Sequence, residues 1–68
     1  MTMNIYLNGE LRNVPDQTTI QALLEILDLT DKRLAVEVNE ELITRSLFFE
    51  HQLQDDDRVE IVQAIGGG

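Results

Sequence analysis

The sequence predicts an α+β fold, in which one main helix covers one face of a mixed sheet of four to five strands. Three observations support this prediction. Segments that alternate apolar and polar residues lie near both ends of the chain, as is typical of half-buried strands. The dipeptide Asn8-Gly9, a strong signal for a tight hairpin turn, follows the first segment. Residues 20–27 instead repeat their apolar side chains with the period of a helix.

The first strand is expected over residues 3–7, with its odd-numbered apolar residues in the core and Tyr6 on the opposite side. The return strand spans residues 10–14 and ends at Pro15, which has no amide hydrogen for a ladder. Thr18 or Thr19 then caps the helix, because a threonine hydroxyl can accept a hydrogen bond from the first turn. The apolar stripe of this helix consists of Ile20, Leu23, Leu24 and Leu27.

Three more strands are expected, over residues 34–38, a short one at Leu42-Ile43, and a last one over residues 58–64. Together with the hairpin and the helix crossover, this order predicts a ubiquitin-like roll, the β-grasp. Its last strand would lie parallel to the first, in the middle of the sheet and flanked on both sides. Residues 1–64 would form this domain, and residues 65–68 a flexible glycine tail.

Composition excludes several classes of function. The 68 residues carry 13 acids and 5 bases, a net charge of −8, so no basic surface for nucleic acid or an anionic membrane is expected. There is no cysteine, no signal-peptide pattern and no long apolar span, and we expect a cytoplasmic protein.

No catalytic or metal-binding constellation is present, so an enzyme is not expected. His51 is the single histidine, without the partners that a metal site needs, and is expected in a partly packed loop. Asp55-Asp56-Asp57 lacks the spacing of a calcium loop and predicts a polar turn. The adjacent pair Phe48-Phe49 is expected to pack as a short turn under the sheet.

The ending Ile65-Gly66-Gly67-Gly68 is the most informative segment. Glycines add little to a fold, but a backbone without side chains can enter a narrow channel and carry a terminal carboxylate to its far end.

We also expect a partner surface on the sheet face without the helix, since exposed apolar residues rimmed by charge often mark interfaces. Its predicted residues are Tyr6, Val62 and Ala64, together with Ile43 or its neighbour Leu42.

Five segments together form a recognisable pattern: residues 4–9 (NIYLNG), 19–24 (TIQALL), 35–39 (AVEVN), 57–62 (DRVEIV) and the ending 65–68 (IGGG). Through these segments the chain resembles the sulfur carrier proteins of the ThiS family over nearly its whole length, and more distantly the molybdopterin-synthase small subunit and ubiquitin. In the turn before the last strand, Asp56 stands where the family often has glycine, and Asp can adopt the conformation that glycine takes there.

This resemblance implies that the Gly68 carboxylate is adenylated by a ThiF-type enzyme and then converted to a thiocarboxylate by a persulfide sulfur. Gly66 and Gly67 would provide clearance, and Ile65 would anchor the base of the tail. A thiazole synthase would receive the sulfur for the thiazole ring of thiamine. The chain itself would bind no cofactor, because ATP and Mg²⁺ belong to the activating enzyme.

Two alternatives stay open at this point. The same chemistry could serve another acceptor, namely a molybdopterin precursor, a tRNA or a protein lysine, because partner surfaces choose the recipient. The chain could instead be a passive β-grasp interaction module whose glycine tail is inert.

Overall fold

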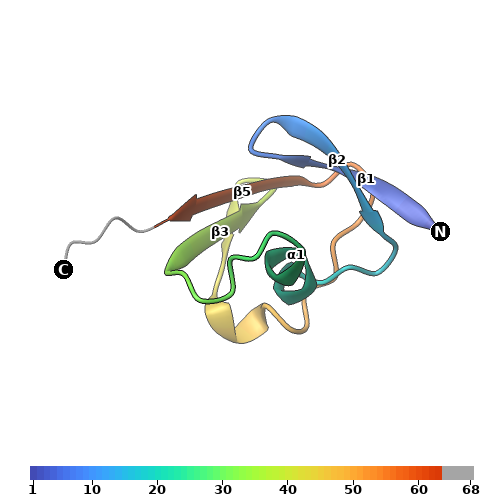
Figure 1. Cartoon of the computed structure of the whole chain (residues 1–68). Coiled ribbons are helices and arrows are strands. Elements are labelled where there is room, and N and C mark those ends of the chain that lie inside the picture. The colour runs from blue at the N-terminus through green and yellow to red at the C-terminus, as the bar shows by residue number, and fades with distance from the viewer. Residues whose placement is uncertain (64–68) are drawn as a thin grey trace.

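The computed structural model describes residues 1–63, which form a five-stranded sheet with one α-helix packed against one face (Figure 1). We call the other side the open face of the sheet. The elements are β1 (Thr2–Leu7), β2 (Glu10–Pro15), α1 (Ile20–Ile26), β3 (Leu34–Val38), β4 (Glu41–Ile43), the 3-10 helix η1 (Arg45–Leu47) and β5 (Arg58–Gln63).

The strand order is β2-β1-β5-β3-β4, with β5 parallel to β1 and antiparallel to β3. This is the predicted β-grasp, with the last strand in the middle. β5 is flanked on both sides, as expected, but its two neighbours pair with different parts of its length. β1 pairs with Arg58 and Val59, whereas β3 pairs with residues 59–63, so the two ladders overlap only at Val59.

Both hairpins of the sheet close through two-residue turns. In the first, Leu7 pairs with Glu10, and Asn8 and Gly9 have φ of 50° and 86°. In the second, Val38 pairs with Glu41, and Asn39 and Glu40 have φ of 52° and 69°. Positive φ at both central residues is the type I′ geometry, whose twist matches that of the flanking strands.

The helix begins as predicted. Thr19 is its N-cap, and its hydroxyl oxygen accepts a hydrogen bond from the Ala22 amide at 3.1 Å. Thr18 is buried instead, and its hydroxyl donates to the Pro15 carbonyl at 2.6 Å. The predicted apolar stripe packs on the sheet, with Ile20, Leu23 and Leu24 buried and Leu27 half-buried.

Two predictions about neighbouring residues are corrected by the core. Ile43 was expected on the open face but is only 7% exposed, whereas Leu42 is 63% exposed. The register explains this, because Leu42 lies opposite the outward-facing Glu37 and Ile43 opposite the buried Val36. The Phe48-Phe49 pair likewise divides, with Phe48 in the core and Phe49 on the surface.

The predicted polar turn before β5 is confirmed. Asp56 has φ of 71°, the left-handed conformation that favours glycine. Carboxylates hold the turn from both sides, since Asp55 accepts from the Asn4 amide and Asp57 from the Gln54 amide, each at 2.8 Å. An aspartate can therefore occupy this position without loss of the strand that follows.

Candidate functional site

The predicted tail residues Ile65, Gly66, Gly67 and Gly68, and the predicted surface residue Ala64, lie outside the described residues. The site that the structure does describe is the strand leading to them, β5, together with the open face around it. Within residues 1–63 no cluster of three His, Asp or Glu side chains could hold a metal ion. The longest described helix, α1, has seven residues, far fewer than a bilayer-spanning helix needs.

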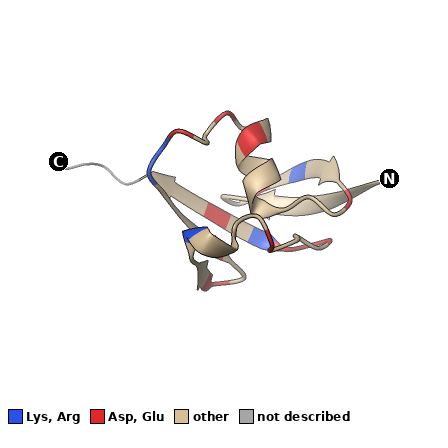
Figure 2. Ribbon diagram, turned by 90° about the horizontal axis from the view of Figure 1, so that it is seen from below, with Lys and Arg blue, Asp and Glu red and all other residues tan. Residues whose placement is uncertain are grey.

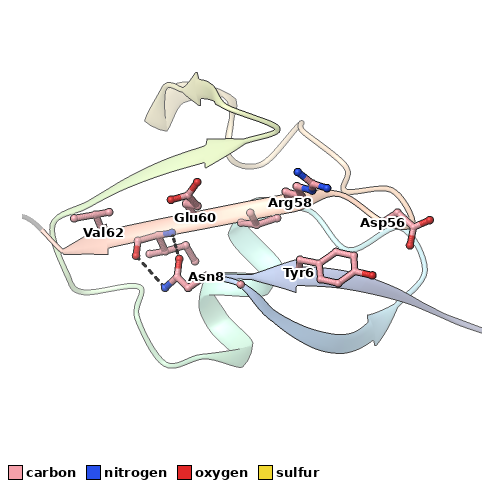
Figure 3. Close-up of a pocket in the computed structure, with 9 residues that line it drawn as sticks. Tyr6, Asn8, Asp56, Arg58, Glu60 and Val62 are labelled. Carbon is pink, nitrogen blue, oxygen red and sulfur yellow. Dashed lines mark hydrogen bonds between the residues drawn. The ribbon is translucent and has the colours of Figure 1, made fainter.

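A depression on the open face follows β5 and the end of β1 (Figure 3). Two predicted surface residues line it, Tyr6 at 40% exposure and Val62 at 61%. Tyr6 lies beside Arg58, and Val62 is four residues farther along β5, a distance of about 13 Å in an extended strand. The structure therefore places both residues on one face without bringing them into contact. The depression is lined by Tyr6, Asn8, Gly9, Asp56, Arg58, Val59, Glu60, Ile61 and Val62.

Sequence reasoning missed Leu11, which is 62% exposed and pairs with Tyr6 across the hairpin. It places an apolar group next to Tyr6 at the β2 side of the open face. The position of Leu11 could have been predicted from the sequence, because a two-residue turn at Asn8-Gly9 fixes the pairing of residues 6 and 11. The same rule applied to the second turn would have selected Leu42 over Ile43.

Charge on this face is mixed along β5. Arg58 and Glu60 point outward near the depression, so a partner would meet a base and an acid between the apolar groups (Figure 3). Two further bases, Lys32 and Arg33, directly precede Leu34, the residue paired with Gln63. Basic residues thus lie near the end of β5 in a chain that is otherwise strongly acidic (Figure 2).

His51 occupies a partly packed loop, as predicted. Its side chain is half-buried, and its carbonyl oxygen accepts a hydrogen bond from the Ile20 amide at 3.1 Å. The residue thus holds the start of α1 through its backbone.

Two asparagine side chains, also missed from the sequence, bind the backbone of β5. The Asn8 Oδ1 atom accepts from the Ile61 amide at 2.9 Å, and its Nδ2 donates to the Ile61 carbonyl at 3.3 Å (Figure 3). The Asn39 Oδ1 atom accepts from the Arg58 amide at 3.0 Å, and its Nδ2 donates to the Asp57 carboxylate at 3.0 Å. We call these contacts the Asn8 bridge and the Asn39 bridge. Each extends support to β5 beyond the point where a neighbouring strand ends.

Known proteins are similar to this chain in sequence and in fold. The model of the ThiS family matches residues 5–68. The sulfur carrier protein ThiS of Bacillus subtilis is 40% identical over 65 residues, which cover 94% of this chain and 98% of that protein. The crystal structure of a thiamine biosynthesis protein (ThiS) from Geobacter metallireducens superposes with a TM-score of 0.81 at 30% identity, over 97% of this chain and all of that one.

One similarity concerns a much longer protein. A thiazole synthase of Magnetococcus marinus is 41% identical over 66 residues, which cover 97% of this chain but 20% of that protein. The chain thus corresponds to about a fifth of this relative, and to nearly the whole of the Bacillus subtilis protein.

Proposed function

The chain belongs to the ThiS family, and we propose that it is a sulfur carrier of thiamine biosynthesis whose Gly68 carboxylate becomes a thiocarboxylate. The observation that carries the proposal is the extent of the family match, which runs from β1 through the glycine ending at residue 68. The carrier is a co-substrate of its partner enzymes and performs no catalysis of its own. It works in the cytoplasm, together with partners that use ATP.

The first proposed step activates the tail. Within a ThiF-type enzyme, a Gly68 carboxylate oxygen attacks the α-phosphorus of Mg²⁺-bound ATP and pyrophosphate leaves, which yields an acyl-adenylate. A free carboxylate is a poor acyl donor, and adenylation supplies the leaving group that it lacks. Gly66 and Gly67 give the clearance that a narrow channel requires, and Ile65 anchors the base of the tail.

The second proposed step introduces sulfur. The terminal sulfur of a donor protein's persulfide attacks the acyl carbon, and AMP leaves with the bonding electron pair. A thiol of the donor then attacks the inner sulfur and breaks the sulfur–sulfur bond, which releases the thiocarboxylate on Gly68 and leaves the donor as a disulfide. The donor and the activating enzyme supply every reactive group except the carboxylate.

A thiazole synthase is the proposed recipient of the sulfur. The Magnetococcus marinus thiazole synthase contains a segment like this chain, which supports a working relation between the two kinds of domain. The open face is the proposed docking surface, and its exposed apolar residues are Tyr6, Val62, the newly found Leu11 and, of the predicted pair Leu42-Ile43, Leu42. Ala64 stays a predicted member of this surface.

The deciding experiment is intact mass measurement of the protein after incubation with ATP, a ThiF-type enzyme and a persulfide donor, followed by fragmentation. Replacement of oxygen by sulfur adds nearly the same mass as oxidation of Met1 or Met3, so the change must be localised. We expect it on Gly68. An unchanged Gly68 after complete reconstitution would reject the carrier in favour of the passive module.

The variant Gly67→Val tests threading of the tail. A branched side chain at this position should block entry into the adenylation channel, so pyrophosphate release should fall at least about a hundredfold, the scale on which misplaced reactants lose rate. The thermal transition should stay unchanged, because residue 67 follows the whole described fold. Normal turnover of Gly67→Val would contradict threading.

A further inference from the structure

We propose that Asn8 is a positioning residue: the Asn8 bridge holds the end of β5 in the sheet, so that the tail leaves from a fixed base. The inference rests on the proposed function for its consequence but on the described geometry for its mechanism. It concerns a side chain 53 positions away from Ile61 in the sequence.

The need for the bridge follows from the pairing of β5. The backbone ladder between β1 and β5 ends where the Asn8 amide donates to the Val59 carbonyl at 2.9 Å. The chain then turns away at Gly9 into the hairpin. From this point the Asn8 carboxamide takes the place of the next peptide group of β1, because it offers one acceptor and one donor to Ile61.

Little else holds the end of β5 on the β1 side. Beyond Val59 the described strand pairing comes from β3 alone, through residues 34–37. Ile61 is half-buried, and Val62 and Gln63 are exposed, so this end of the strand buries little apolar surface. A strand end with one paired neighbour and few buried contacts opens at low free energy. The Asn8 bridge therefore supplies the second flank that the backbone lacks.

The consequence for a carrier is a smaller ordering cost on binding. A partner that takes up the tail must fix every residue that was free beforehand, and each fixed residue costs conformational entropy. If the end of β5 is already in place, that cost does not include the residues at the end of β5. If it frays, the cost includes Ile61 to Gln63 as well, and the apparent affinity falls.

Asn39 provides a matched control. It is also the first residue of a type I′ turn, with φ of 52° against 50° for Asn8, and it also makes two side-chain hydrogen bonds. Its bridge, however, reaches Arg58 and Asp57 at the start of β5, away from the tail. Glycine tolerates positive φ, so Asn8→Gly and Asn39→Gly each remove a bridge while keeping the turn.

The first measurement is amide hydrogen exchange by NMR on the intact protein. Asn8→Gly should speed exchange of the Ile61 amide about fivefold, the factor expected for loss of one exposed hydrogen bond. Asn39→Gly should speed exchange at Arg58 and leave Ile61 unchanged. Unchanged exchange at Ile61 in Asn8→Gly, or equal acceleration in both variants, would overturn the inference.

The second measurement is the kinetics of pyrophosphate release with a ThiF-type enzyme. Asn8→Gly should raise the KM for the carrier about fivefold with kcat unchanged, because the lost free energy is an ordering cost met on binding. Asn39→Gly should change neither constant. Equal constants for wild type and Asn8→Gly would refute a positioning role. If the wild type itself is not adenylated, the proposed function fails, while the exchange experiment still decides whether Asn8 fixes β5.

Asn8 also lines the open-face depression, so a direct contact with the partner must be separated from positioning. The Gly67→Val background does this, since its tail cannot enter the channel and only the body docks. Asn8→Gly should leave the docking affinity of Gly67→Val unchanged. A fivefold loss in that background as well would assign Asn8 to partner contact and overturn positioning.

Discussion

The two hairpin turns of this molecule are nearly identical in geometry and differ in what they support. Both are type I′ turns that begin with asparagine, and both asparagines bind β5. β1 runs parallel to β5 and β3 runs antiparallel to it, and both strands end opposite Val59. The Asn8 turn therefore extends toward the end of β5 and the Asn39 turn toward its start.

The difference shows that the same local arrangement, an asparagine that begins a type I′ turn, can support the fold at one place and the proposed function at another. Loss of the Asn39 bridge weakens the entry to β5, which the Asp55–Asp57 turn also holds. Loss of the Asn8 bridge weakens the end of β5 that leads to the proposed site of chemistry. Turn type and residue type do not distinguish these roles; the direction of the strand before each turn does.

The largest effect is expected at the residue that both neighbouring strands share, because its loss should affect the two ends of β5 alike. Val59 is fully buried, and it is the one residue of β5 that pairs with both β1 and β3. Val59→Ala should lower the free energy of unfolding by about 2 kcal/mol, from lost burial and the cavity left behind. Chemical denaturation would measure this, and exchange at Ile61 and Arg58 should then rise together. Acceleration at one end only would mean that the two bridges act independently of the shared strand.

Much of this fold could be predicted from the sequence because its signals are local. The period of Ile20 to Leu27, the Thr19 cap and the Asn8-Gly9 turn each depend on neighbours within a few residues. The β3 bounds, Leu34–Val38, follow from simple alternation and agree with the structure. Strand phase predicted from alternation was correct wherever alternation extended over five residues.

The errors have a common physical cause. The β4 strand has three residues, too few to show its phase, so Ile43 was assigned to the surface although the register buries it. Nothing in the Phe48-Phe49 dipeptide says which ring faces inward. The Asn8 bridge joins residues that are neighbours only because β5 lies beside β1, so it became visible with the strand order.

An intermediate effect is expected from a substitution that gives the first turn, Asn8-Gly9, the Asn-Glu pair of the second. Gly9→Glu places a side chain at φ of 86°, where no atom lies within 4 Å of the added Cβ, so the cost comes from the backbone alone. We expect a loss of about 1 kcal/mol in the free energy of unfolding. Chemical denaturation would measure it, with the Asn8 bridge retained and Ile61 exchange tracking global stability. A loss well above this would mean that the turn, and with it the bridge, has rearranged.

The smallest effect is expected from a substitution that gives the second turn, Asn39-Glu40, the Asn-Gly pair of the first. Glu40 holds φ of 69° without the freedom of glycine, so Glu40→Gly relieves strain in the second turn. Glycine also gains entropy in the unfolded chain, which offsets part of the benefit, and a net stabilisation of about 0.5 kcal/mol is expected. Because this turn supports the start of β5, adenylation constants should equal those of the wild type while the denaturation midpoint rises. A changed KM in Glu40→Gly would show that the second turn also reaches the tail, and the division of roles between the two asparagines would then be wrong.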